Sequence, residues 1–370
     1  MRILHTSDWH LGKSLNQVSL IEDQRYMVNK ILDIIKKDNI EVLLICGDIF
    51  DKANPTVEAL KLFEDILYQI SKLDIKTVII GGNHDNYARL GYGSNFLSNF
   101  NIYLYTNLED ILTPLSFDGE VGFYCLPYFS TYKMRSFLSG EKISNADEGY
   151  QAIIARQIAN NDYPIKIALL HNYVINGEKS DSESIFSLGG IDSLSPKVFK
   201  DFNIVAAGHL HKSQKMGKNI FYSGSILKYS VSEHNQNKMV YIYDTKSMSG
   251  RKEMLIPQYD VVVLQDTLDS LLTDEKYDQY INDYVYCELT NKEFLHEPIS
   301  KLRSKFKNCI GLKRLYLALN PNRDNTIGKV DDLQDIELFK NFYQYVTNNE
   351  MNEALINKLG ELFDEMGGQQ

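Results

Sequence analysis

The stretch VLLICGDIFD, residues 42–51, decides the fold of this chain. Its first half, Val42–Cys46, is a short apolar run of the kind that forms a buried parallel strand. Its second half, Gly47–Asp51, brings in two carboxylates at the point where that strand is expected to leave the sheet. Functional sites of open α/β sheets form at this carboxyl edge. The stretch therefore predicts a parallel α/β sheet with a polar site at its edge.

The same layout occurs at four other places in the first 211 residues. The apolar, β-branched runs are Ile3–Thr6, Thr77–Ile80, Ile165–Leu170 and Ile204–Ala207. The polar motifs that follow them are Asp8-Trp9-His10, Gly81-Gly82-Asn83-His84-Asp85, His171 and Gly208-His209-Leu210-His211. One such motif is a weak indication, because a single Asp often caps a strand and a single His often lies in a core. Five motifs in order, each at a strand end, favour one shared site.

Helix patterns alternate with these strands, which is typical of a parallel sheet with helices packed on its faces. We expect helices over residues 21–37, 56–73 and 146–159. Two βαβ halves that face one another would then form a layered α/β sandwich. Two later strands, 220–222 and 239–243, are expected to run antiparallel to their neighbours.

The composition changes near Pro257, and a smaller unit follows. Strand patterns at 261–264, 285–289 and 313–319, with a helix over 292–306, predict a compact α/β capping domain.

The chain ends in a polar linker and two amphipathic helices, with apolar stripes over 333–346 and 351–366. Such a stripe usually faces a core, but little chain remains here to cover one. Docking on a partner is therefore as good a prediction as docking on the chain's own domain. The predicted division is a main domain over 1–256, a capping domain over 257–323, and a linker with a helical tail over 324–370.

The composition is that of a soluble protein with a substantial core. Of 370 residues, 44% are hydrophobic and 24% are charged. The chain opens directly into a strand pattern, without a signal-like segment, and no apolar run approaches the ~20 residues of a membrane helix. We therefore expect a soluble, cytoplasmic protein with no membrane association. The four cysteines form no C-x-x-C pair and are expected to be structural thiols.

The formal charge of −10, taken alone, argues against nucleic acid as a partner. The charge is unevenly distributed, however, because residues 331–370 carry −7 and residues 1–330 only −3. Within the latter, residues 299–323 contain seven Lys and Arg residues and no acid. This basic stretch fits a solvated helix face as well as a phosphate-binding surface, so the net charge does not exclude DNA.

The side chains of the motifs suit a pair of divalent metal ions. The candidate ligands are Asp8, His10, Asp48, Asn83, His171, His209 and His211. Asp8 and His10 are two residues apart and can chelate one ion, and the two oxygens of Asp48 can bridge two ions. This mixed nitrogen and oxygen set suits Mn²⁺, Fe²⁺ or Zn²⁺ better than Ca²⁺. Two such ions ~3.5–4 Å apart can stabilise both the attacking and the leaving oxygen, so phosphate ester hydrolysis is the natural reaction.

His84 and Asp85 form a separate pair of candidate catalytic residues. A histidine beside the metals can donate a proton to the leaving oxygen, and Asp85 can orient its ring or raise its basicity. Such an acid contributes ~10²–10⁴-fold to the rate. A scaffold that keeps the fold but binds no metal is the rival interpretation, and the presence of every expected ligand disfavours it.

The five motifs resemble those of the calcineurin-like metallophosphoesterases. Within that superfamily, the opening Asp8-Trp9-His10-Leu11-Gly12 and the segments Tyr222-Ser223-Gly224-Ser225, Tyr229-Ser230 and Ser232-Glu233 resemble the SbcD family. Members of that family are the nuclease subunits of bacterial SbcCD complexes, and the resemblance spans roughly the whole chain. The alternative is another calcineurin-like phosphatase or nucleotide phosphodiesterase, but these lack a separate cap with a helical tail.

The resemblance implies a division of the ligands between two manganese ions. One ion would take Asp8, His10, Asp48 and His211, and the other Asp48, Asn83, His171 and His209. His84 would be the proton donor, supported by Asp85.

The resemblance also implies partners and an activity. The tail would dock on an SbcC-like ATPase, the capping domain would bind DNA, and the nuclease subunit would form a homodimer within a heterotetramer. The implied activity is that of an ATP-dependent 3′→5′ exonuclease on double-strand ends and an endonuclease that opens hairpins, in DNA repair, recombination and replication.

Overall fold

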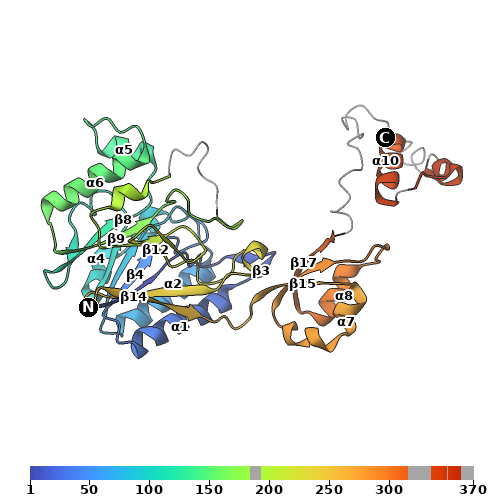
Figure 1. Ribbon diagram of the computed structural model, residues 1–370, viewed down its shortest axis with the longest axis horizontal. Helices are drawn as coiled ribbons and strands as arrows, with labels where there is room; N and C mark the ends of the chain where they lie inside the picture. The colour runs from blue at the N-terminus through green and yellow to red at the C-terminus, as the bar shows by residue number, and fades with distance from the viewer. Residues whose placement is uncertain (184–192, 316–334, 348, 360–370) are drawn as a thin grey trace.

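The computed structural model describes residues 1–183, 193–315, 335–347 and 349–359 (Figure 1). Two six-stranded sheets form its largest part. In sheet order, the first contains β14 (Ser249–Leu255), β13 (Lys238–Asp244), β1 (Arg2–Thr6), β4 (Val42–Cys46), β5 (Lys76–Ile80) and β6 (Ile102–Tyr105). The second contains β11 (Gln214–Met216), β12 (Ile220–Tyr222), β10 (Ile204–Gly208), β9 (Ile165–His171), β8 (Val121–Leu126) and β7 (Leu115–Ser116).

Helices cover the outer faces of the two sheets (Figure 1). The first sheet carries α1 (Ile21–Lys37) and α2 (Val57–Ser71). The second carries α5 (Thr131–Phe137), α6 (Ala146–Asn160) and the 3-10 helix η2 (Pro196–Phe199). The shorter elements are β2 (Ser14–Leu15), β3 (Val18–Ser19), α3 (Tyr87–Leu90), α4 (Ser94–Leu97), η1 (Ser98–Phe100) and η3 (Val231–Glu233).

Strand β4 explains how the layers pack. Val42, Leu44 and Cys46 belong to the core between the two sheets. Leu43 and Ile45 point the other way and join the core beneath α1 and α2. Because side chains alternate across a strand, a strand buried on both faces has a continuous apolar sequence. The predicted layered α/β sandwich is confirmed.

The direction of β12 differs from the prediction. It pairs parallel with β10, and antiparallel only with β11. The chain runs back along β11 and turns at Gly217, which has a φ of +58°, so that β12 returns in the direction of β10. The prediction for the other strand is correct, since β13 pairs antiparallel with β1.

A separate unit follows β14. It contains β15 (Val261–Asp266), α7 (Leu268–Thr273), η4 (Glu275–Tyr280), β16 (Tyr284–Leu289), α8 (Pro298–Lys305) and β17 (Asn308–Arg314). The three strands form a parallel sheet in the order β15-β16-β17. Leu271, Val285, Leu302 and Phe306 lie in a core of its own. We call this unit, residues 260–315, the cap.

Helix α8 is shorter than the expected helix over 292–306, because it begins at Pro298. Proline favours the first turn of a helix, where its missing N–H has no partner to lose. The cap touches the sandwich through polar contacts: Tyr284 Oη donates to Asp23 Oδ2 at 2.6 Å, and Asn16 Nδ2 donates to the carbonyl of Ile310 at 2.7 Å.

The final part of the described chain is helical. Helix α10 spans Asp335–Thr347, and residues 353–359 are helical as well. Phe339, Phe342 and Val346 of α10 are 41%, 57% and 42% exposed. The predicted linker and the end of the second stripe lie largely outside the described residues. Among the described helices, none is both long and apolar enough to cross a membrane.

Candidate metal centre

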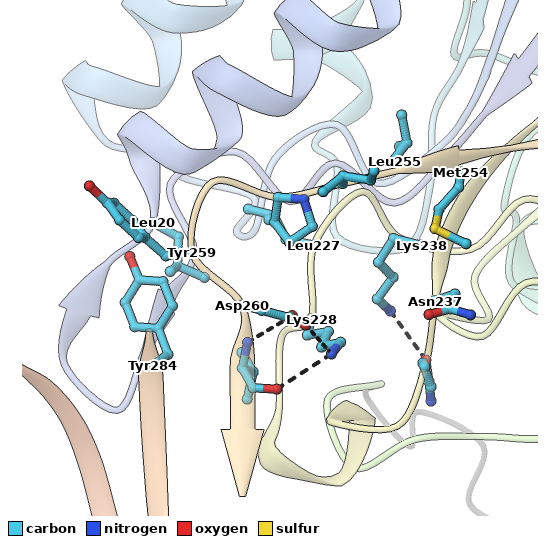
Figure 2. A pocket seen from close by; sticks show the side chains of 14 residues that line it. Leu20, Leu227, Lys228, Asn237, Lys238, Met254, Leu255, Tyr259, Asp260 and Tyr284 are labelled. Atoms are coloured by element: carbon cyan, nitrogen blue, oxygen red, sulfur yellow. Dashed lines mark hydrogen bonds and ion pairs between the residues drawn. The ribbon is translucent and has the colours of Figure 1, made fainter. Parts of the chain in front are cut away.

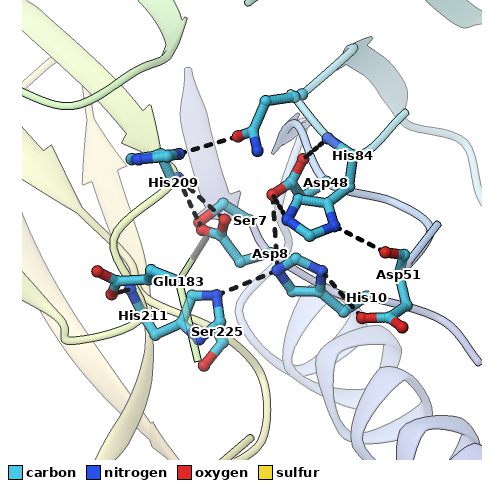
Figure 3. A network of polar contacts seen from close by, with 12 residues as sticks. Ser7, Asp8, His10, Asp48, Asp51, His84, Glu183, His209, His211 and Ser225 are labelled. Carbon is cyan, nitrogen blue, oxygen red and sulfur yellow. Dashed lines mark hydrogen bonds and ion pairs between the residues drawn. The ribbon is translucent and has the colours of Figure 1, made fainter. Parts of the chain in front are cut away.

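Five strand ends meet at one place between the two sheets. Figure 3 shows Asp8, Asp48 and His209 gathered there. In the first sheet, β1, β4 and β5 end just before Asp8, Asp48 and Asn83. In the second sheet, β9 ends at His171 and β10 ends just before His209. The two remaining candidate ligands, His10 and His211, follow in the adjoining loops. The structure thus brings together all seven candidate metal ligands.

Asp48 lies in the middle of this group. Its Oδ2 is 3.6 Å from Nε2 of His10 and 3.4 Å from Nε2 of His171. On the first side, Nε2 of His10 is 3.1 Å from Nε2 of His211. One carboxylate therefore faces two separate groups of nitrogen ligands.

Asn83 lies on the second side of Asp48. Its Oδ1 is 3.1 Å from Nε2 of His171 and 2.9 Å from Nδ1 of His209. Atoms that bind one transition-metal ion at ~2.0–2.2 Å are necessarily ~3–3.5 Å apart, as these are. Three groups of possible ligand atoms lie within 4.8 Å of one another: Asp8, His10 and His211; His10, Asp48 and His84; and Asp8, Asp48 and His171. The residues present fit divalent ions that accept nitrogen and oxygen ligands.

The backbone is strained at four of the candidate ligands. Asp8, His10 and Asp48 have φ values of +52°, +45° and +50°, and His209 has +102°. Residues other than glycine seldom adopt this region, and each instance costs on the order of 1–3 kcal/mol. The loops thus turn abruptly after their strands, which directs the side chains into the space between the sheets.

Three glycines of the motifs leave room for these side chains. A Cβ on Gly47 would be 2.2 Å from Nδ1 of His171, and a Cβ on Gly82 would be 2.2 Å from Oδ1 of Asp48. A Cβ on Gly208 would be 2.0 Å from the carbonyl oxygen of Cys46. These positions require glycine because of close approach.

Hydrogen bonds fix the tautomer of His171. Its Nδ1 is 2.8 Å from the carbonyl oxygen of Cys46. A carbonyl only accepts, so Nδ1 keeps its proton when the ring is neutral, and Nε2, which faces Asp48 and Asn83, is the nitrogen that can bind a metal. A metal-binding histidine commonly donates its other N–H in this way.

Burial and neighbouring charges set the protonation states. Burial alone would raise the pKa of Asp48, but His171 and its other histidine neighbours outweigh this and hold the pKa well below its ordinary value. Burial lowers the pKa of His10 far below its usual range and that of His209 to about 3. Burial alone would lower the pKa of His171, but Asp48 outweighs burial and raises that pKa to about 9. Metals bind ionised carboxylates and neutral imidazoles, so metal binding at His171 releases a proton.

The two candidate catalytic residues are placed differently. Nδ1 of His84 donates to the carbonyl oxygen of Asp51 at 2.7 Å, and Nε2 lies 4.0 Å from Asp48 Oδ2. The carboxylate of Asp85 instead accepts backbone N–H groups of Ile49, Phe50 and Gly82, at 3.1, 3.0 and 2.9 Å. The structure thus gives Asp85 a role in holding two metal-site loops together. The ring of His84 is oriented by a main-chain carbonyl.

Sequence reasoning assigned no site role to the residues that surround His211. Its Nδ1 is 2.6 Å from Ser182 Oγ and 3.3 Å from Glu233 Oε1, and its backbone N–H donates to Glu183 at 2.7 Å. The sequence points to Ser232-Glu233 only through the family resemblance. No spacing links it to His211 along the chain.

Two opposed sheets with a cluster of Asp, His and Asn at their shared edge define a metallophosphoesterase. The model of the family "Calcineurin-like phosphoesterase" matches residues 1–213, and that of the "Type 5 capsule protein repressor C-terminal domain" matches residues 257–364. The chain is 30% identical over 369 residues to the D subunit of the SbcCD nuclease of Staphylococcus epidermidis, covering 98% of both chains. It is 28% identical to that of Staphylococcus saprophyticus, covering 95% of this chain and 94% of the relative.

The chain therefore belongs to the calcineurin-like phosphoesterases and, within them, to the family of SbcCD nuclease D subunits. Among solved structures, TT1561 of Thermus thermophilus covers 69% of this chain and 99% of its own at 13% identity, with a TM-score of 0.43. The predicted enzyme class, a metallophosphoesterase hydrolase, is confirmed.

All four cysteines are free and buried, as expected of structural thiols.

Proposed function

We propose that this protein is a metal-dependent DNA nuclease, the SbcD-type component of an SbcCD-like complex. The observation that carries the proposal is the central carboxylate of Asp48, which has a group of nitrogen ligands on either side. The relatives named as D subunits of the SbcCD nuclease point to the substrate class, which is DNA. The proposal includes two divalent ions, both manganese, and ATP-dependent 3′→5′ cleavage of double-strand ends with opening of hairpins.

The proposed ligand sets follow the two sides of Asp48. Asp8, His10 and His211 would hold one ion and Asn83, His171 and His209 the other, and Asp48 would bridge them. When bound, the ions would supply Lewis-acid stabilisation of the negative charge that develops on the phosphate. Asp48 and its neighbours hold this charge-binding arrangement in place before substrate arrives.

His84 is the proposed general acid. Its Nδ1–H bond to the Asp51 carbonyl holds the ring so that Nε2 points toward the cluster. A proton on Nε2 can then pass to the leaving oxygen of the cleaved phosphodiester. Asp85 would act indirectly, because it holds the loop that carries His84 against the loop that carries Asp48.

Cleavage of linear duplex DNA by wild type and by His84→Gln, each with Mn²⁺, tests the proposal. A nuclease predicts duplex cleavage that His84→Gln reduces by ~10²–10⁴-fold, with metal binding kept. A phosphatase or nucleotide phosphodiesterase would cleave only small esters, and a scaffold would cleave neither substrate. Either of those results would contradict the proposal.

The cap is the proposed DNA-binding domain, with its basic stretch over residues 299–323 toward the phosphate backbone. Lys301 and Lys313 are exposed on the cap and are available to DNA. Lys305 is paired with Asp278 at 2.8 Å, and the guanidinium of Arg314 donates to the carbonyl of Glu293 at 2.5 Å. Arg323 lies outside the described residues. Reversal of Lys301 and Lys313 should weaken DNA binding most at low salt, whereas reversal of Lys305 should mainly affect the cap itself.

The helical tail is the proposed docking segment for an SbcC-like ATPase. Exposed Phe339, Phe342 and Val346 on α10 support this, because apolar side chains gathered on one helix face favour a protein partner. Deletion of residues 331–370 should abolish co-purification with the ATPase and leave Mn²⁺-dependent cleavage of a simple phosphodiester intact. Retention of the ATPase by the shortened chain would contradict this assignment.

We also propose that two copies pair within a heterotetramer in the cytoplasm. Exposed Leu60 and Tyr68 of α2, with Phe96 of α4 and Phe100 of η1, line an apolar cavity of about 500 Å³ that suits a symmetric contact. The double variant Tyr68→Asp/Phe96→Asp should be monomeric by light scattering, with Lys52→Asp as the charge control on another loop. A double variant that still pairs would contradict this surface.

A further inference from the structure

A buried polar network reaches from the metal centre to the cap, and the proposed reaction leaves it without a role. It belongs to segment 228–238, which contains η3 and enters β13. Lys228 and Lys238, at the two ends of the segment, both line a cavity of about 150 Å³ beside the junction with the cap (Figure 2). Glu233 lies between them and is fully buried.

Glu233 holds the ring of the candidate ligand His211. Its Oε1 is 3.3 Å from Nδ1 of His211, and the hydroxyl of Ser182 joins the two by donating to Oε1 while accepting from Nδ1. Because a carboxylate only accepts, Nδ1 carries the proton and Nε2 presents its lone pair toward His10. A carboxylate behind a ligating histidine fixes both its tautomer and its ring orientation.

The side chain of Lys238 holds His211 through the main chain of that histidine. Its Nζ donates to Glu233 Oε2 at 2.5 Å, to the carbonyl of His211 at 3.0 Å and to Ser225 Oγ at 2.9 Å. The side chain of Lys238 is only 3% exposed, so its charge depends on Glu233 for compensation. One buried ion pair therefore fixes His211 at the ring and at the backbone.

Lys228 ties the same segment to the cap. Its Nζ is 2.8 Å from Asp260 Oδ2 and 2.7 Å from the carbonyl oxygen of His234, the residue after Glu233. Asp260 immediately precedes β15, and β15 packs against η3. The start of the cap and the main chain beside Glu233 are thus bound to one ammonium group. Figure 2 shows the contact of Lys228 with Asp260.

We infer that Glu233 and Lys238 are positioning residues for His211, and that segment 228–238 couples the position of the cap to the metal affinity of that ligand. A displacement of Asp260 pulls on Lys228 and on the backbone at His234, and Glu233 then shifts relative to the imidazole. By reciprocity, metal binding at His211 favours one position of the cap. This inference rests on the proposed metal centre and adds a means of regulating it.

The test is a calorimetric titration of Mn²⁺ into the metal-free full-length chain. Glu233→Gln keeps the shape of the side chain, removes its charge, and should weaken one Mn²⁺ site by ~10–100-fold. Asp260→Asn, in a side chain that is 42% exposed, should weaken the same site by a few-fold. Lys212→Met is the matched control: it breaks an exposed ion pair with Glu178 directly after His211, and Mn²⁺ affinity should stay at the wild-type value.

A second set of titrations shows whether Glu233 affects Mn²⁺ affinity through His211. In a His211→Ala chain, Glu233→Gln should cause no further loss of Mn²⁺ affinity, because contacting residues that act as one unit are not additive. A further loss there, or a wild-type affinity for Glu233→Gln alone, would overturn the positioning role. If circular dichroism shows that Glu233→Gln is unfolded, Glu233→Gln/Lys238→Met removes both charges of the pair and takes its place.

The measurements distinguish a failure of the proposed metal centre from a failure of the proposed coupling to the cap. If the wild-type chain binds no Mn²⁺, the metal centre itself is wrong. If it binds Mn²⁺ and Asp260→Asn binds it equally well, the coupling to the cap is wrong while the metal centre stands.

Discussion

Gly82→Ala should disable the site by moving Asp48. A Cβ at position 82 would be 2.2 Å from Oδ1 of Asp48 and 2.3 Å from its backbone nitrogen, whereas ordinary contact begins at 3.4 Å. One of the two loops must therefore retreat by about 1 Å. Since a misplacement of ~1 Å can cost ~10²-fold in rate, we expect a loss of at least that size together with weaker Mn²⁺ binding.

The neighbouring glycine provides the matched control. A Cβ on Gly81 would meet only Leu90, Thr106 and Tyr87, at 3.8, 3.8 and 3.9 Å, which are ordinary contacts. Initial rates on a chromogenic phosphodiester with Mn²⁺, and Mn²⁺ affinities by calorimetry, should be near wild type for Gly81→Ala and strongly reduced for Gly82→Ala. Wild-type kinetics and affinity in a folded Gly82→Ala protein would refute the claim that the site depends on this close approach.

Three further predictions concern stability. Removal of Mn²⁺ with EDTA should lower the melting temperature, because a metal at 100 times its dissociation constant stabilises the fold by ~2.7 kcal/mol; an unchanged melting curve would contradict a site built for metal. Tyr284→Phe removes the 2.6 Å hydrogen bond to Asp23 and should cost ~1–3 kcal/mol in urea unfolding of the junction, since a buried carboxylate loses its donor. Thr56→Ala removes the N-cap of α2, whose hydroxyl accepts from Ala59 N–H, and should cost ~1 kcal/mol, whereas Thr56→Ser should restore stability.

The sequence allowed the sandwich and the seven candidate ligands to be predicted because both depend on local signals. Val42–Cys46 is apolar throughout, and Gly47 and Asp48 follow it, so ten residues are enough to predict both the strand and its polar end. Parallel strands bring their carboxyl ends to the same edge, which assembles distant motifs without any knowledge of their contacts.

Contacts that join distant residues, or that involve the main chain, could not be read in the same way. The partner of His171 Nδ1 is a backbone carbonyl, so no side chain in the sequence indicates this contact. Asp85 stands beside His84 in the sequence, yet its carboxylate receives N–H groups from the loop of another strand. Glu233 is separated from His211 by a hairpin and a loop, and only the fold makes them neighbours.

The origin of the ligands shows how metal binding and folding are connected. The loops of the first sheet contribute Asp8, His10, Asp48 and Asn83, and those of the second contribute His171, His209 and His211. Either proposed ion would therefore bind to both sheets at once, across the core that separates them. Metal binding should oppose any sliding of one sheet over the other, in addition to preparing the reaction. Four candidate ligands have strained backbones with positive φ, and the free energy of metal binding offsets that strain. A state in which the two sheets are not packed together cannot bind the metals in this way, so it does not gain that energy.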